Sequence, residues 1–144
     1  MIGVDTNILV YAHRRDSSWH APAQAALRRL AEGATPWVIP YHCLVEFYAV
    51  ATHPRIYAPA STPEQAVSQI RAWLESPSLS IAYSDLSSAD RLLALSVSAN
   101  LKGAQIHDGR VVVDALCAGV QTFWSADRDL SKFSEMAVFN PLRQ

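Results

Sequence analysis

The sequence is poor in lysine, in cysteine and in long hydrophobic runs, and each shortage narrows the class of protein. Ten of its 12 basic residues are Arg, which leaves only Lys102 and Lys132, and the net charge of −1 by itself indicates neither a nucleic-acid nor a membrane partner. The two cysteines, Cys43 and Cys117, lie in apolar helical stretches without CxxC or zinc spacing, so we expect reduced, buried thiols in a cytoplasmic protein. No apolar run reaches membrane-spanning length, and no basic segment precedes an apolar one as in a signal peptide.

What the sequence does contain is 50% hydrophobic residues in a chain of 144, which predicts one folded domain spanning residues 1–144. Short apolar runs indicate strands at residues 2–4, 37–39, 79–82 and 121–124, with an edge strand at 138–139. Helical patterns occupy the intervals, at about residues 8–12, 20–31, 41–52, 63–74, 87–101 and 108–118. Strands that alternate with helices form parallel sheets, so the fold class is α/β with a mostly parallel sheet.

The first strand ends in a group of polar residues that the rest of the chain is organised around. Val4 is followed by Asp5, Thr6 and Asn7 before the chain becomes apolar again. In open α/β sheets ligands bind outside the carboxyl ends of the strands, which is where Asp5 is expected. Asp5 alone is equally well explained as a solvated loop residue or as a helix N-cap, a role that Thr6 or Asn7 could also fill.

Glu46 is the only Asp, Glu, Lys or Arg in the helix predicted at residues 41–51. The helix is apolar nearly all round, so we expect its carboxylate to be partly desolvated and to need an Arg or a metal ion as partner. A structural ion pair is the alternative to a functional role. The residues assigned to the buried stripe of this helix are Tyr41, Leu44, Val45, Tyr48 and Ala49.

Two further acids complete a pattern. Asp108 opens the last long helix, where it could also act as a cap, and Asp127 follows the fourth strand as Asp5 follows the first. Asp114 lies about 120° from Asp108 around the helix axis, so both cannot point at one site, while Asp129 competes with Asp127 as the acid after the fourth strand. Four carboxylates meeting at one end of a sheet would repel one another without a cation. Oxygen ligands without a Cys or His cluster select Mg²⁺ or Mn²⁺, which suits phosphoryl chemistry.

These residues resemble the PIN-domain family, and more narrowly the VapC toxins of bacterial toxin–antitoxin pairs. The resemblance runs in order over the whole chain. Its motifs are Val4-Asp5-Thr6-Asn7, Glu46 with Ala51-Thr52-His53-Pro54-Arg55, Asp108, and Ser125-Ala126-Asp127-Arg128-Asp129-Leu130. Departures are Gly109 where Ala is common, the run Val111-Val112-Val113 in place of better helix formers, and the extra acid Asp114.

The resemblance implies an α/β/α sandwich and a Mg²⁺- or Mn²⁺-dependent endoribonuclease acting on structured RNA such as tRNA or rRNA. It also implies a homodimer and inhibition by a VapB-like antitoxin. The family's metal-binding acids correspond to Asp5, Glu46, Asp108 and Asp127, and its hydroxyl residues near the metal correspond to Thr6 and Ser125. For the dimer surface, the helices carrying Trp73 and Tyr48 are the candidates.

Two other functions compete with this one. A haloacid-dehalogenase-like phosphatase also places an Asp after the first strand, but it would need a second Asp where this chain has Asn7. A catalytically silent PIN scaffold is disfavoured because all four acids are present.

Neutralising four metal-bound carboxylates changes the formal net charge from −1 to +3 and leaves a mildly basic surface. That surface is expected to carry Arg14, Arg15, Arg28, Arg29 and Arg128, and of the five histidines only His107 is expected near the site.

Overall fold

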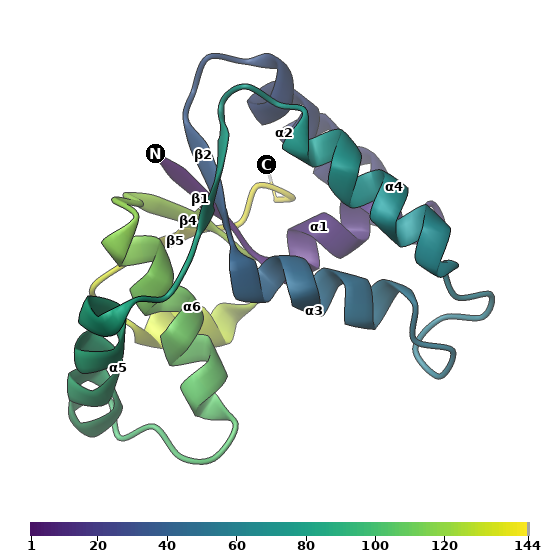
Figure 1. The fold of residues 1–144 in the computed structure, drawn as a ribbon. Coiled ribbons are helices and arrows are strands. Elements are labelled where there is room, and N and C mark those ends of the chain that lie inside the picture. Colours follow the sequence, from purple (N-terminus) through teal and green to yellow (C-terminus); the bar gives the residue numbers. More distant parts are fainter. Residues whose placement is uncertain (144) are drawn as a thin grey trace.

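Five short strands form one parallel sheet in the order β3-β2-β1-β4-β5 (Figure 1). This is a computed structural model, and it describes residues 1–143. The predicted α/β class is confirmed, and the strand expected near the C-terminus forms one edge of the sheet. The strands are β1 (Ile2–Val4), β2 (Trp37–Pro40), β3 (Leu79–Ala82), β4 (Thr122–Trp124) and β5 (Ala137–Phe139).

Helices cover both faces of the sheet, as the α/β/α sandwich requires (Figure 1). From the central strand β1 the chain first moves to β2 and β3, and later to β4 and β5 on the other side. Because parallel crossovers are right-handed, this reversal puts the early helices on one face and the later ones on the other. The first group is α1 (Thr6–His13), α2 (His20–Glu32), α3 (Tyr41–Ala51) and α4 (Pro63–Leu74), and the second is α5 (Leu86–Ser98), α6 (Gln105–Cys117) and the 3₁₀ helix η1 (Arg128–Lys132).

The three central strands, β2, β1 and β4, carry fully buried side chains of the core. Val4, Trp37, Val38, Ile39 and Phe123 have no exposed surface. Gly3 is required at the pairing of β1 with β4, because a Cβ atom added there would lie 2.4 Å from Cδ2 of Phe123. The glycine therefore lets a buried aromatic ring lie directly over the strand that carries Asp5.

The exposure of residues in four helices differs from the prediction. In α3 the buried residues are Cys43, Phe47 and Ala51, whereas Tyr41 and Val45 are exposed, so the stripe assigned from the sequence was wrong. A helix that is apolar all round has no periodicity to show which face is buried. In α5 the sequence pattern predicts that Leu92, Leu93, Leu95 and Val97 point mostly inward, but Leu93 and Val97 are exposed. Cys117 of α6 is exposed rather than buried, and Trp73 of α4, named for the dimer surface, is buried.

Helix ends agree with the predictions to within three residues. Thr62 and Gln65 form the expected start of α4, where each side chain accepts a hydrogen bond from the other residue's backbone N–H, at 3.2 and 2.9 Å. Helix α6 starts at Gln105, three residues before the expected start, so Asp108 lies in its first turn and is not its cap. Within residues 1–143, none of the helices has the length and apolar character needed to cross a bilayer.

Replacing Gly3 with Ala tests the contact between β1 and β4. The added methyl group would meet a ring that cannot move away, because Phe123 is fully buried. We expect Gly3→Ala to lower the free energy of unfolding by about 1–3 kcal/mol. Urea denaturation of Gly3→Ala, Phe123→Leu and the double variant measures this. A smaller side chain at position 123 should relieve the clash, so the double variant should lose less unfolding free energy than the sum of the two single variants. A loss equal to that sum would contradict the steric explanation.

Candidate metal-binding active site

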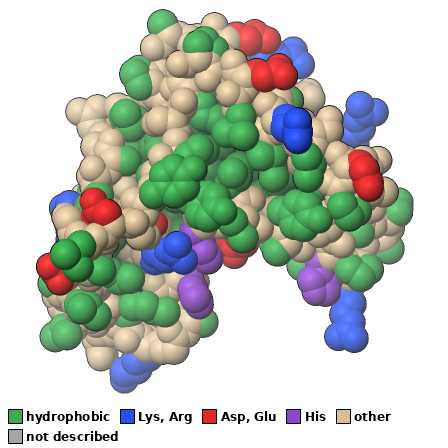
Figure 2. All heavy atoms as spheres, viewed as in Figure 1, with side chains coloured by type: hydrophobic (Ala, Val, Ile, Leu, Met, Phe, Trp, Pro, Cys, Tyr) green, Lys and Arg blue, Asp and Glu red, His purple; other side chains and the backbone are tan. Residues whose placement is uncertain are grey.

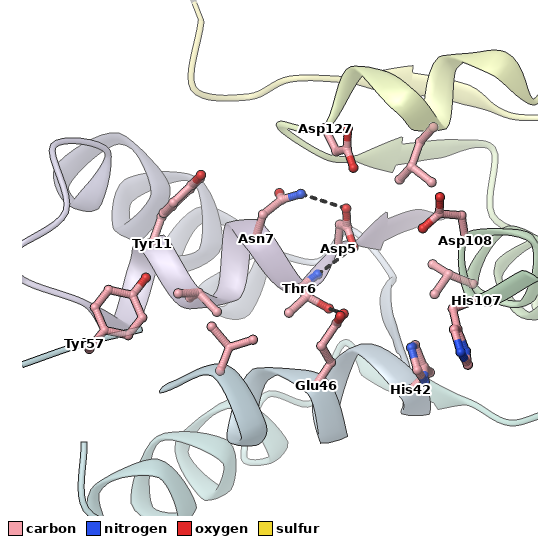
Figure 3. A pocket seen from close by; sticks show the side chains of 14 residues that line it. Asp5, Thr6, Asn7, Tyr11, His42, Glu46, Tyr57, His107, Asp108 and Asp127 are labelled. Atoms are coloured by element: carbon pink, nitrogen blue, oxygen red, sulfur yellow. Dashed lines mark hydrogen bonds between the residues drawn. The ribbon is translucent and has the colours of Figure 1, made fainter. Parts of the chain in front are cut away.

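A pocket of about 300 Å³ lies at the C-terminal ends of β1 and β4, where the direction of the crossovers reverses (Figure 3). This switch point is where open α/β sheets bind their ligands, because diverging connections leave a crevice there. All four acids singled out in the sequence line the pocket. Asp5 comes from the end of β1, Glu46 from α3, Asp108 from the first turn of α6 and Asp127 from the segment after β4.

Asp5 is an N-cap, one of the structural roles that the sequence offered for it, and it also lines the pocket. It is the N-cap of α1, with Oδ1 accepting a hydrogen bond from the Thr6 backbone N–H at 2.8 Å. Its other oxygen, Oδ2, accepts hydrogen bonds from Ser125 Oγ at 2.6 Å and from Asn7 Nδ2 at 2.8 Å. Capping and pocket lining are therefore compatible, and the carboxylate is held by donors from two strand ends.

Burial raises the pKa of Asp5 from 3.8 to about 6. The hydrogen bonds from Ser125 and Thr6 favour the charged form and oppose this shift, whereas the negative charges of Glu46 and Asp127 add to it. A neighbouring cation would stabilise the ionised form of such a carboxyl group, because it would compensate for the lost hydration and for the repulsion from the nearby acids.

Glu46 is exposed, and the expectation that its carboxylate is desolvated was therefore wrong. The apolar surroundings inferred from the sequence lie on the other side of α3, where Cys43 and Phe47 are buried. Its partner is neither an Arg nor a residue of the same helix, but the hydroxyl group of Thr6, which donates to Oε2 at 2.6 Å. Thr6 thus joins the Glu46 carboxylate to the start of α1, next to Asp5.

The segment after β4 is fixed against α1 by hydrogen bonds. Asn7 donates from Nδ2 to Ser125 Oγ at 3.1 Å and accepts from the Ala126 backbone N–H at 3.0 Å. Ser125 Oγ also accepts from the Asp127 backbone N–H at 2.9 Å. Asp127 itself is exposed and caps η1, accepting from the Asp129 backbone N–H at 2.8 Å. Of these two acids, Asp127 lines the pocket and Asp129 does not.

The two acids of α6 lie apart. Asp108 is half-buried at the pocket wall and forms an ion pair with Lys132 Nζ at 3.4 Å. Asp114 is buried outside the pocket, where it accepts hydrogen bonds from Ser84 Oγ and pairs with Arg110. This separation agrees with the angle between the two positions on the helix.

The four acids line the pocket as separate groups. Within residues 1–143, no three His, Cys, Asp or Glu side chains lie close enough together to form a preassembled metal-binding set. Glu46 is turned toward Thr6, and Asp108 toward Lys132. The donor chemistry nevertheless fits a hard divalent cation, because all four groups offer carboxylate oxygens and the most buried of them has a pKa raised in part by its acidic neighbours.

Four further side chains line the pocket: Tyr11, His42, Tyr57 and His107 (Figure 3). His107 was expected there from the sequence, and the other three were missed. His42 lies four residues before Glu46 and Tyr11 four after Asn7, so i,i+4 spacing on one helix face could have identified both. Tyr57 lies in a loop, and no periodicity points to it. The imidazoles of His42 and His107 stack in parallel, with ring centroids 5.7 Å apart and planes at 3°.

Arg14 does not belong to the basic surface predicted from the sequence. Its guanidinium is nearly buried and donates two hydrogen bonds to Asp16, at 2.6 and 2.9 Å, and one to the Pro59 carbonyl at 3.0 Å. It also lies 4.1 Å from the ring centroid of Tyr57. Arg14 therefore fixes the loop that carries Tyr57 to the pocket and is not free to bind a substrate.

The raised pKa of Asp5 predicts how the stability of metal-free protein depends on pH. Native Asp5 keeps its proton up to about pH 6, whereas the unfolded chain releases it near 3.8, so the stabilisation from the protonated form is complete below about pH 4 and lost by about pH 6. Asp5→Asn cannot ionise. The unfolding free energy of the wild type, minus that of Asp5→Asn, should fall by about 1–2 kcal/mol between these pH values.

Urea denaturation of both proteins in EDTA, at a series of pH values, measures that difference. Acids such as Asp16 titrate in both proteins, so their contributions cancel. A difference that stays constant from pH 4 to pH 7 would contradict the burial of the Asp5 charge.

The two alternative functions find no support in comparisons with known proteins. The family model described as "PIN domain" matches residues 2–136. A VapC ribonuclease of Mycobacterium bovis is 34% identical over 144 residues, covering 99% of this chain and 96% of the relative. Ribonuclease VapC48 of Mycobacterium tuberculosis is 24% identical and covers 95% of this chain and 94% of the relative. No haloacid-dehalogenase relative appears among these matches.

Solved structures share the fold at lower sequence identity. VapC20 of Mycobacterium tuberculosis, described as a sarcin-ricin loop cleaving toxin, superposes with a TM-score of 0.69 at 16% identity, covering 93% of this chain and 95% of that one. VapBC2 of Rickettsia felis, bound to a DNA fragment from its promoter, gives 0.71 at 18% identity, with 97% and 98% covered. The family model spans nearly the whole chain and the relatives align along its full length, and this chain therefore belongs to the PIN-domain family.

Proposed function

We propose that this protein is a VapC-like endoribonuclease that hydrolyses phosphodiester bonds in structured RNA such as tRNA or rRNA, with Mg²⁺ or Mn²⁺ as cofactor. The observation that carries the proposal is that four acids from four separate elements line one pocket at the switch point of the sheet. The similarity to VapC ribonucleases over the full length supports the activity.

Asp5, Glu46, Asp108 and Asp127 would hold the cation, since PIN-domain VapC nucleases generally depend on a divalent metal. The chemistry that Mg²⁺ or Mn²⁺ supplies in such a site is activation of the attacking water and stabilisation of the charge that develops on the phosphate. Two of the site acids follow strands, and of these Asp127 is exposed whereas Asp5 is half-buried. Its contact with solvent suits Asp127 to orient the attacking water or to accept a proton from it.

The hydroxyl and amide groups around Asp5 keep its carboxylate in one orientation. Three donors, Thr6, Asn7 and Ser125, point at its two oxygens and fix them before any ligand arrives. Thr6 does the same for Glu46 through a 2.6 Å hydrogen bond. Asp5 and Glu46, held in this way, lose little conformational freedom when they bind a cation, whereas Asp108, paired with Lys132, would have to reorient to join them.

The histidines do not provide a metal-free route. A nuclease that uses two histidines as acid and base needs them on opposite sides of the reacting phosphate. Here the two pocket histidines, His42 and His107, are stacked in parallel on one wall (Figure 3). Burial also lowers the pKa of His42, although the negative charge of Glu46 opposes this. Hydrolysis should therefore use water as nucleophile, without the substrate 2′-hydroxyl.

Cleavage of bulk tRNA should need the metal and the acids together. We expect Asp5→Asn to reduce kcat at least about 100-fold while the protein stays folded, because one of the fixed carboxylates that would hold the cation is lost. The matched control is Asp129→Asn, which changes an exposed acid two residues from the site and should keep activity. EDTA should abolish cleavage, and Mg²⁺ or Mn²⁺ should restore it.

The ends of the cleaved RNA decide the mechanism. We expect a 5′-phosphate and a 3′-hydroxyl, because water attacks the phosphorus and the 3′-oxygen leaves. End-group analysis and thermal melting of the same samples measure the chemistry and the fold. Formation of a 2′,3′-cyclic phosphate in EDTA would refute the metal-dependent mechanism even if the family assignment stands.

A VapB-like antitoxin is the protein partner that the comparisons support. The superposed VapBC2 structure of Rickettsia felis contains a toxin–antitoxin pair, and VapBC-1 of nontypeable Haemophilus influenzae gives a further match at a TM-score of 0.62. A ribonuclease that acts on tRNA or rRNA must meet its target in the cytoplasm. Its activity there requires control, which the antitoxin would provide.

We also infer a homodimer, formed through the apolar surface at the carboxyl ends of β2 and β3. The exposed side chains of this surface include Tyr41 and Tyr83, whose rings lie 5.1 Å apart. Val45 and Leu86, which follow these tyrosines by one helical turn or less, are exposed as well. Leu86 is 81% exposed, which is costly for so large an apolar side chain unless a partner covers it. Trp73, expected from the sequence to be part of such a surface, is buried and does not contribute.

A charge in this surface should prevent the association. We expect Val45→Glu to convert the dimer to a folded monomer, because the carboxylate would be buried without a partner. Phe139→Glu is the control, since Phe139 is also half-exposed but lies in β5, at the opposite edge of the sheet. Light scattering measures the mass of each protein, and a wild-type monomer at high concentration would refute the dimer.

A further inference from the structure

The acid that the proposed nuclease site does not use, Asp114, has a defined place in the fold. It is only 2% exposed, and both of its oxygens face the hydroxyl group of Ser84 at 2.8 Å. Its cationic partner is Arg110, whose Nε lies 3.7 Å from Oδ2. A buried carboxylate is costly without a cation, so Arg110 is held in place by the charge beneath it.

Arg110 is held beside the catalytic pocket. His107, Arg110 and Asp114 are spaced i, i+3 and i+7 along α6, so they form a stripe on one face of the helix. At the pocket end of this stripe, His107 stacks on His42 from α3, and both histidines line the pocket. Arg110 follows His107 by three residues on the same face of α6, so it lies one helical turn from the stacked histidines. Figure 2 shows His and basic side chains together at the edge of a notch where acidic atoms reach the surface.

The guanidinium has capacity for a second partner. The side chain of Arg110 is 40% exposed, and the ion pair with Asp114 uses its Nε atom. Within residues 1–143, its two terminal amino groups make no hydrogen bond to the protein. Lys132, whose ammonium group lies at the pocket wall beside Asp108, is already paired with that site acid. Arg110 is therefore held on one side by the buried carboxylate of Asp114 and is exposed to solvent on the other.

We propose that Arg110, oriented by Asp114 and one helical turn from the stacked His42 and His107, binds a backbone phosphate of the RNA next to the bond that is cleaved. This deepens the proposed ribonuclease function and rests on it. The physical need is clear, because a polyanion that approaches four carboxylates is repelled unless cations lie along its path. The planar guanidinium suits a phosphate, to which it can donate two parallel hydrogen bonds. Asp114 is then a positioning residue, with no contact to the substrate.

Two measurements on Arg110→Gln test this proposal with bulk tRNA as the probe. Steady-state cleavage should show KM raised about tenfold with kcat within about twofold, because a contact made equally in ground and transition states is lost. Binding is measured separately in an Asp5→Asn background, which prevents cleavage, over a series of KCl concentrations. The slope of log K against log salt should fall by about one when one phosphate contact is removed.

The chain offers a matched control in Arg28, which forms the same i,i+4 pair with Glu32 but lies on α2 with both side chains well exposed. Arg28→Gln should leave KM and the salt slope unchanged. Asp114→Asn keeps the guanidinium but releases its anchor, so KM should rise less than in Arg110→Gln. Arg110→Lys, which keeps the charge without the planar fork, should recover part of the affinity.

Loss of a buried ion pair can unfold a protein, so a further variant keeps the test decisive. Arg110→Gln/Asp114→Asn removes both charges and leaves no carboxylate stranded; it should melt near the wild-type temperature and still bind RNA weakly. Equal effects of Arg110→Gln and Arg28→Gln on KM and salt slope would overturn this inference alone. Arg110-dependent RNA binding without metal-dependent cleavage would overturn only the proposed ribonuclease. Absence of both binding and cleavage in the wild type would overturn both.

Discussion

The hydrogen bond between Ser125 Oγ and Asp5 Oδ2, at 2.6 Å, is the contact on which the arrangement of the site depends. It joins the end of β1 to the end of β4, two strands that are neighbours in the sheet but lie 120 residues apart in the chain. Asn7 extends the junction. Its side chain donates hydrogen bonds to Asp5 and Ser125 and accepts one from the backbone N–H of Ala126. The same few groups therefore cap α1, fix the segment that carries Asp127 and define one side of the pocket.

This junction explains why the sheet is built so tightly just below the site. The pairing of Gly3 with Phe123 lies two residues before Asp5 and two before Ser125, and the absent Cβ lets the strands and the buried ring meet. A side chain there would force either the strand or the buried ring of Phe123 to move. Because charge-assisted hydrogen bonds weaken steeply with distance and angle, the geometry of the carboxylate depends on packing in the core.

The order of elements and the four acids could be predicted from the sequence, because short apolar runs and capping residues report local structure. The face of α3 could not, since a helix that is apolar on all sides gives no direction; Glu46 was therefore assigned to a desolvated environment although it is exposed and held by Thr6. Arg14 was assigned to a basic surface, but it is anchored by Asp16 and packed on Tyr57. Such pairings join residues whose spacing in the chain carries no periodic signal, so only the folded structure reveals them.

Helix α6 carries opposite charges along two different lines. Its first turn places Asp108 at the wall of the pocket, while the stripe of His107, Arg110 and Asp114 follows a different line along the same helix. Four carboxylates attract a cation but repel RNA, and a basic side chain placed among them would be neutralised, as Lys132 is by Asp108. Anchoring an arginine to a separate, buried carboxylate avoids this competition. In the proposed nuclease the positive charge would then stay near the site without being drawn into it, so a metal-binding centre would be compatible with a polyanionic substrate.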